Sequence, residues 1–187
     1  MNIGTAHRFF SRSALALAVA TGLPCEAQPA AAPMSALPEY KVKAAFVYNF
    51  ALFTDWPQAS LNDGAPLNVC VNAESALRPA LNEFNDKAIK GRRMQIRAWT
   101  DAADAVRQCH VLVLDSVDRE RWVHLRKDLA GASVLTVADD AEIGRRGAIV
   151  TLHLENNRIS FDIDVNAARE ARLTLSSKLL RLARTTP

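Results

Sequence analysis

Short apolar runs alternate with helical segments through the middle of the chain, and this alternation constrains the fold more than any other feature. Four runs have the length and composition of β-strands: residues 67–71, 94–98, 111–114 and 133–137. Helical patterns lie between them, at residues 76–84, 101–106 and 119–129. The run Val111–Leu114 is continuously apolar, as in strands that are buried on both faces of a parallel sheet. The alternation therefore predicts an α/β fold with a mainly parallel sheet.

The pattern changes after Gly147. Two runs of alternating polarity, residues 148–154 and 158–164, flank Asn156 and Asn157. Asn tolerates positive φ, so these runs predict a tight hairpin. On its second strand, Ile159, Phe161 and Ile163 are expected to face the core.

A last helix is expected from an N-cap at Asn166 to about Ala183. Its predicted apolar stripe is Ala168, Leu175, Leu179 and Leu182. The expected fold is thus one α/β domain with a mainly parallel mixed sheet of about six strands, flanked by helices and ending in a β-hairpin and a C-terminal helix. A chain of 187 residues suits one such domain at ~150 residues per domain.

The first helix of the domain is expected at residues 39–53, between Pro38 and the Trp56-Pro57 pair. Its apolar residues follow the helical spacing i, i+3, i+4 and i+7, which predicts an inward stripe. That stripe is Val42, Ala45, Phe46, Asn49, Phe50 and Phe53.

The first 27 residues have the pattern of a secretory signal. Arg8 and Arg12 precede an apolar run, residues 13–23, that is too short to span a ~30 Å hydrocarbon core. Cleavage is expected after Ala27. An uncleaved anchor is one alternative, and a lipid anchor on Cys25 is another. The Pro/Ala-rich residues 28–38 are expected to be a flexible linker, and residues 39–187 to be the folded domain.

Removal of the signal would leave two cysteines, Cys70 and Cys109. An even number of cysteines in an oxidising compartment favours a disulfide, with two buried free thiols as the alternative. A zinc site is not indicated, because the cysteines lack a paired Cys or His at ligand spacing.

Composition and motifs exclude several classes of function. The content of 49% hydrophobic and 23% charged residues is typical of a globular chain. The net charge of +3 and the interspersed basic residues do not indicate a nucleic-acid partner. No glycine follows the first strand, so no nicotinamide or phosphate loop is expected, and no cofactor is predicted. Without a nucleophile paired to a base, an enzyme is the least favoured class.

Three stretches of the chain resemble the YfiR family: residues 39–57, the two cysteine-bearing segments 67–71 and 109–112, and residues 147–183. The most specific part is Lys43 with Tyr48-Asn49-Phe50, Trp56-Pro57 and both cysteines. The resemblance covers residues 39–184, nearly all of the expected mature chain.

The resemblance implies a periplasmic, non-enzymatic protein. Its family namesake represses an inner-membrane diguanylate cyclase by binding that enzyme's periplasmic sensor region, which lowers cyclic di-GMP and biofilm formation. An outer-membrane OmpA-like lipoprotein relieves the repression. Members form homodimers with disulfides. The namesake's second disulfide has no counterpart here, since Arg145 and Leu152 stand where its cysteines are expected.

Two functional hypotheses follow. A regulator that acts by protein contact would need an exposed apolar surface, and the candidates lie off the predicted stripe of the first helix: Tyr40, Val47, Tyr48 and Leu52. A sensor of a small ligand would instead use a polar rim at the carboxyl ends of the strands. Its candidates are Asp139, Glu142, Arg145 and Arg146, which a solvated loop would equally explain.

Overall fold

The computed structural model describes residues 36–186 of the chain. The predicted signal, its cleavage position and Cys25 lie outside the described residues, as does the predicted linker up to Ser35. Helix α1 (Ala36–Leu52) begins three residues before the predicted domain start, so the end of the predicted linker is helical.

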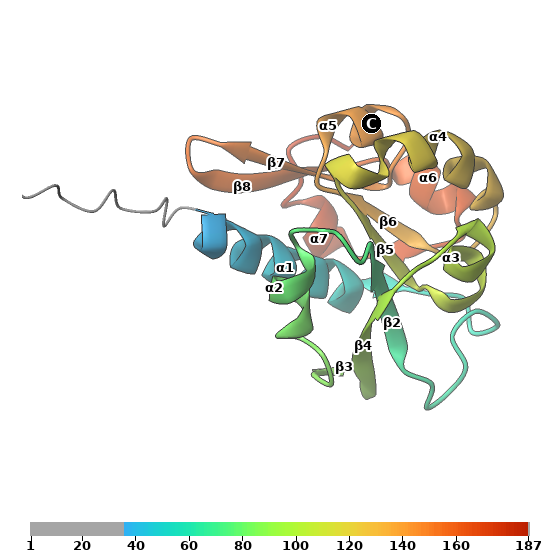
Figure 1. Cartoon of the computed structure of the whole chain (residues 1–187). Helices are drawn as coiled ribbons and strands as arrows, with labels where there is room; N and C mark the ends of the chain where they lie inside the picture. Colours follow the sequence, from blue (N-terminus) through green and yellow to red (C-terminus); the bar gives the residue numbers. More distant parts are fainter. Residues whose placement is uncertain (1–35, 187) are drawn as a thin grey trace, which may run out of the picture. The chain divides into compact units, whose positions relative to one another are not determined.

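A seven-stranded mixed sheet forms the centre of the domain, which confirms the predicted fold class (Figure 1). Its order is β3-β4-β2-β5-β6-β7-β8. The five strands from β4 to β7 are parallel, and β3 and β8 pair antiparallel at the two edges. The strands are β2 (Leu67–Val71), β3 (Ala88–Ile89), β4 (Arg92–Ala98), β5 (Val111–Leu114), β6 (Leu135–Ala138), β7 (Val150–Glu155) and β8 (Arg158–Ile163).

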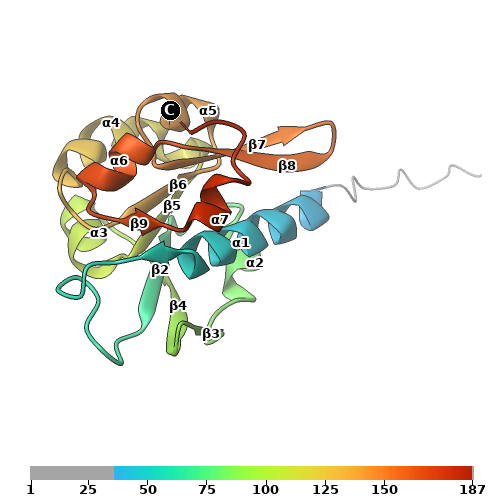
Figure 2. The same cartoon turned by 180° about the vertical axis from the view of Figure 1, so that it is seen from behind.

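Helices cover both faces of this sheet (Figures 1 and 2). The core on one face includes side chains of α1, α2, α6 and α7, and the core on the other face includes side chains of α3, α4 and α5. Strand β5 is buried on both sides, because its alternate side chains enter different cores. The helices are α2 (Arg78–Asn82), the 3-10 turn η1 (Ser116–Asp118), α3 (Ala102–Gln108), α4 (Arg119–Asp128), α5 (Ala141–Arg145), α6 (Val165–Glu170) and α7 (Ser177–Leu180).

The inward face of α1 differs from the predicted one. The buried residues are Lys43, Ala44, Val47, Phe50 and Ala51, whereas Val42 and Asn49 of the predicted stripe are exposed. The helix is apolar on most of its circumference, so two stripes fit the 3.6-residue period equally well. Only packing against the sheet decides between them.

The predicted C-terminal helix is wrong as a single element. Helix α6 has its N-cap at Asp164 rather than Asn166, and the chain leaves it at Arg172, whose φ is 58°. Leu173 then donates to the carbonyl of Ala168 and is buried. This is the hydrogen bond that closes a left-handed helix end.

A short antiparallel pair separates α6 from α7. Strand β9 (Thr174–Leu175) pairs with β1 (Thr54–Asp55), which directly follows α1. Ser176 then caps α7 by accepting a hydrogen bond from the backbone of Lys178. Pairing with a distant segment therefore replaces the middle of the predicted helix.

The predicted hairpin is confirmed. Strands β7 and β8 flank Asn156 and Asn157, whose φ values are 50° and 62°. Phe161 and Ile163 are buried in the core that contains α1, and Ile159 packs against it. In Figure 1 the hairpin projects beyond the rest of the sheet on the same side as the start of α1.

Candidate functional site

A disulfide joins β2 to the segment that precedes β5, the neighbouring strand. Cys70 lies in β2, and Cys109 lies between α3 and β5, with their Cα atoms 5.7 Å apart. Both residues are buried in the core formed with α3, α4 and α5. Neighbouring parallel strands β2 and β5 bring them together, as the sequence predicts.

The parallel strands β4, β2, β5, β6 and β7 follow the order 2-1-3-4-5 when numbered along the chain, and this order reverses between β2 and β5. In doubly wound sheets, ligands bind outside the carboxyl ends at such a point. In this protein, polar side chains that form hydrogen bonds with one another occupy the carboxyl ends of β2 and β5. Asn72 donates to Asp118 at 2.7 Å, and Ser75 donates to Asp115 at 2.6 Å.

Asp139, a member of the predicted ligand rim, faces α1 instead of a pocket. Its carboxylate lies 2.7 Å from Nζ of Lys43, which also contacts Glu39 at 2.5 Å. Burial disfavours the charge on Lys43, but hydrogen bonds to Asp139 and Glu39 outweigh that effect and raise its pKa. Burial raises the pKa of Asp139, and Lys43 offsets this only in part. The group is a buried ionic link between α1 and the end of β6.

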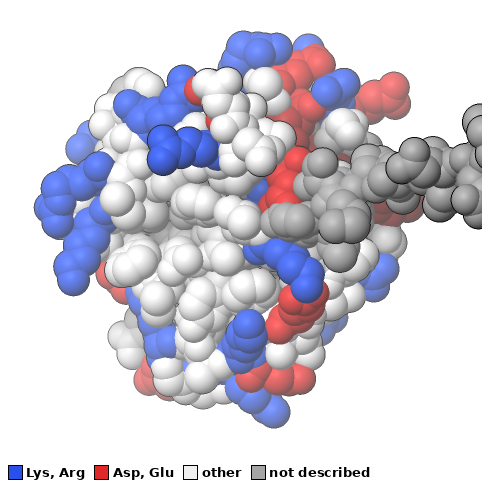
Figure 3. Space-filling model, turned by 90° about the vertical axis from the view of Figure 1, so that its left-hand side faces the viewer, with Lys and Arg blue, Asp and Glu red and all other residues white. Residues whose placement is uncertain are grey.

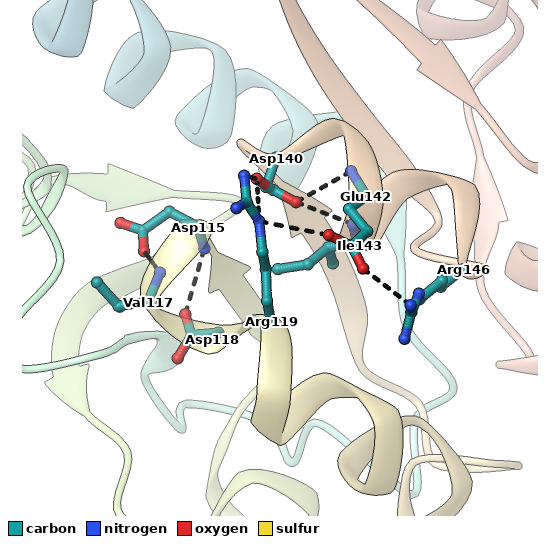
Figure 4. Close-up of polar contacts among 8 residues, drawn as sticks. All are labelled: Asp115, Val117, Asp118, Arg119, Asp140, Glu142, Ile143 and Arg146. Atoms are coloured by element: carbon teal, nitrogen blue, oxygen red, sulfur yellow. Dashed lines mark hydrogen bonds and ion pairs between the residues drawn. The ribbon is translucent and has the colours of Figure 1, made fainter.

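Glu142 and Arg146 belong to a second network, at the start of α5 (Figure 4). Asp140 accepts hydrogen bonds from the backbone of Glu142 and Ile143, so it caps α5. Arg119 of α4 binds Asp140 through Nε at 2.9 Å, and Glu142 lies 2.8 Å from Arg146. Burial alone would raise the pKa of Asp140, but the Arg119 guanidinium and the two backbone donors lower it. These charges join α4 to α5.

Arg145 points elsewhere and lines a cavity of about 260 Å³ between α5, the hairpin and Thr185. His153 and Asp162 line the same cavity, with His153 Nε2 2.7 Å from Asp162 Oδ2. The predicted rim is therefore wrong as one site, because Asp139, the Glu142–Arg146 pair and Arg145 face three different places. Spacing along the chain could not reveal this, since a short helix turns successive side chains apart.

Arg145 and Leu152 also do not face one another. Leu152 enters the core that contains α1, whereas Arg145 is exposed beside the cavity. The neighbouring positions Gly144 and Thr151 are the close pair, because a Cβ on Gly144 would lie 3.0 Å from the Thr151 Cβ.

The predicted partner surface on α1 is only partly accessible. Val47 is completely buried, which corrects its assignment to an exposed patch. Tyr48 donates to the carbonyl of Ala88 and packs against the ring of Phe84, and the half-buried Tyr40 and Leu52 pack against the core.

The opposite side of α1 is the accessible one. A groove of about 290 Å³ runs along it, lined by Lys41, Val42, Ala45, Phe46 and Asn49. These residues were missed because the sequence pattern assigned most of them to the core. No signal in the pattern distinguishes the two faces.

Within residues 36–186, no group of three or more His, Cys, Asp or Glu side chains is arranged to hold a metal ion. No helix of that part of the chain is long and apolar enough to cross a bilayer.

The strand order, the internal disulfide and the exposed helix groove define a doubly wound α/β domain with one internal disulfide and an exposed groove on α1. A YfiR/HmsC-like family model matches residues 40–184. The chain belongs to this family.

Comparison with solved structures finds a crystal structure described as a conserved domain protein from Vibrio cholerae O1 biovar El Tor. It is 12% identical, with a TM-score of 0.49 and coverage of 79% of this chain. This chain spans 60% of that protein's length. No curated protein matches the sequence.

Proposed function

We propose that the protein binds the periplasmic sensor region of an inner-membrane diguanylate cyclase and represses the enzyme without catalysing a reaction itself. The exposed apolar groove on α1 is the observation that supports contact with a protein partner. Family membership supports the signalling context. An OmpA-like outer-membrane lipoprotein that relieves repression and a homodimeric state belong to the same proposal.

The groove is suited to recognition because α1, the helix that carries it, is held in place by the contacts of its inward side. The inward side of α1 is buried in the core, and Lys43 ties the helix to Asp139. On the outward side, Val42 is 45% exposed and Phe46 is half-buried against Phe161. A rigid surface of this kind binds without a large ordering cost.

Repression requires that the protein bind the inactive conformation of the cyclase more tightly than the active one. A difference of about 3 kcal/mol shifts a two-state equilibrium by ~150-fold, which is within ordinary allosteric coupling. A few apolar side chains at the centre of an interface are sufficient for an effect of this size.

Two valines of equal exposure allow a matched test. Val42 in the groove and Val117 in η1 are both 45% exposed, so either can be replaced by Asp without burying a charge. We expect Val42→Asp to raise cyclic di-GMP to the level of a gene deletion and to abolish capture of the cyclase from detergent-solubilised inner membrane. Val117→Asp should behave as wild type. If Val42→Asp still represses, or if deletion leaves cyclic di-GMP unchanged, the proposal is wrong.

A small-ligand sensor is the second candidate, and the cavity that contains Arg145, His153 and Asp162 favours it. Its cationic and anionic groups suit a small polar molecule. Native mass spectrometry of protein isolated from the periplasm should then show a retained ligand that Arg145→Ala removes. Only unliganded protein would count against this candidate.

A further inference from the structure

A second apolar surface lies next to the α1 groove, at the end of the chain. Leu182 follows α7 and is 71% exposed, and Leu154 on the projecting hairpin is 47% exposed. With Val42 they are three of the five large apolar side chains that are exposed within residues 36–186. An exposed apolar area that is rimmed by polar residues marks a site of contact with a protein or a membrane.

Hydrogen bonds hold these elements together. The backbone of Arg184 donates to Phe161 of β8, and the backbone of Ile163 donates to Thr185, so the terminal segment lies along the free edge of β8. The Arg184 side chain binds Glu155 at the hairpin turn at 2.6 Å. Figures 1 and 2 both place α7 beside the base of the hairpin.

Several exposed cations belong to the same elements as the exposed leucines. Lys178 lies in α7, Arg181 is the C-cap of that helix, Arg158 begins β8 at the hairpin turn, and all three are exposed, as is Arg184. Glu155, the acid at this turn, is paired with Arg184. Figure 3 views the molecule from the side toward which the hairpin projects, and it shows a broad uncharged area with Lys and Arg side chains, and also Asp and Glu side chains, at its edges.

From this arrangement we propose that the terminal face, defined as Leu154, Arg158, Lys178, Arg181 and Leu182, adheres to the surface of a bilayer that contains anionic phospholipid. Lys and Arg bind the headgroup phosphates, and the two leucines enter the interface between headgroups and acyl chains. A second copy of the chain is a poor occupant, because a two-fold axis would place these cations against their own copies. Adhesion would leave the neighbouring α1 groove free beside the membrane.

Vesicle flotation tests the proposal with the mature chain. The vesicles contain 30% phosphatidylglycerol and 70% phosphatidylethanolamine, and vesicles of phosphatidylcholine alone are the uncharged reference. We expect binding to the anionic vesicles only, and weaker binding at high salt. Each cation near such a surface contributes about 1 kcal/mol, so neutralising Lys178 and Arg181 as Lys178→Gln/Arg181→Gln should lower the partition coefficient roughly 30-fold.

The matched control is Arg126→Gln/Lys127→Gln, which removes the same charge from exposed positions on α4, a helix that packs on the other face of the sheet. This variant should bind nearly as wild type. Leu182→Ser should weaken binding while every charge is kept, and circular dichroism checks that each variant is folded. No binding to anionic vesicles, equal losses in the two charge variants, or no loss in Leu182→Ser would each overturn the proposal.

Capture of the cyclase in detergent does not depend on a bilayer. A protein that fails to float with vesicles but still captures the cyclase would refute membrane adhesion and leave the proposed function standing. A protein partner for the terminal face would be revealed if Lys178→Gln/Arg181→Gln lost capture in detergent while wild type failed to bind vesicles, and this result would also overturn the proposal.

Discussion

Replacing Lys43 by Met removes the cation of the buried link between α1 and β6 while keeping most of the side-chain volume. The side chains of Lys43 and Asp139 are only 8% and 12% exposed. Loss of one partner from such a pair costs about 3–5 kcal/mol, because the remaining charge stays buried. Since Asp139 keeps slight access to water, we expect the lower end of this range, about 3 kcal/mol in the free energy of unfolding.

The loss should depend on pH. The pKa of Asp139 is already raised by burial in the folded state, and without Lys43 it rises further. A carboxyl whose folded pKa lies above its unfolded pKa destabilises the fold at high pH, and this penalty disappears as pH falls through the folded pKa. The stability deficit of Lys43→Met should therefore be largest at pH 7 and shrink toward pH 5.

Urea unfolding followed by circular dichroism measures the deficit at both pH values. Lys41→Met is the matched control, since Lys41 lies on the same helix but pairs with Glu83 at the surface, with 51% and 53% of the two side chains exposed. Its cost should not exceed about 1 kcal/mol. The double variant Lys43→Met/Asp139→Asn should recover part of the loss. A Lys43→Met deficit that equals the control, or that is the same at pH 5 and pH 7, would refute the reasoning.

Three further predictions concern covalent and steric features. Cys109→Ser should lower the free energy of unfolding by about 2–5 kcal/mol in urea titrations, because Cys70 loses its disulfide; an unchanged midpoint would contradict the assigned bond. Gly144→Ala should cost about 1–3 kcal/mol in the same assay, since its Cβ would meet the Thr151 side chain, and Thr151→Ala in the same chain should relieve part of the cost; additive losses would argue against this contact. Mass spectrometry of the periplasmic fraction should find a chain that begins near Gln28, and a full-length cytoplasmic species would contradict export.

The sheet could be predicted because its signals are local. The run Val111–Leu114 is apolar throughout, and the strand contributes to both cores. Asn156 and Asn157 supply the positive φ values that a tight hairpin requires. In each case the residues whose pattern predicts the element are the same residues that form it, so the sequence pattern was sufficient to predict the strand and the hairpin.

The end of the chain could not be predicted in this way. Residues 165–183 have a helical pattern, but pairing of β9 with β1 interrupts it. The partner strand lies more than a hundred residues earlier, and helical propensity does not register such a contact. Tertiary pairing and burial of Leu173 outweigh the propensity. The same break turns Leu182 outward, although the helical stripe predicted it to be buried.

The prediction of a single ligand rim was wrong for a related reason. Asp139, Glu142 and Arg145 are close in sequence, but Asp139 follows the end of β6 whereas the other two lie in α5, and each faces a different place. The exposed groove was missed because either face of α1 could have been the buried one. Sequence reasoning located the right helix, but only the position of the sheet determines which side a partner can reach.

Packing of the inward face of α1 against the sheet determines how the outward face of the helix is oriented. Lys43 lies one residue from Val42, so the ion pair that fixes the inward side also fixes the orientation of the groove. A helix held only by apolar contacts can rotate or slide at moderate cost, since alternative apolar packings of similar volume are close in energy. A buried charge has no such freedom, because it is stable only opposite its partner. We therefore expect the Lys43–Asp139 pair to act together with packing against the sheet, so that one of two nearly equivalent apolar stripes is buried and the other stays available for recognition.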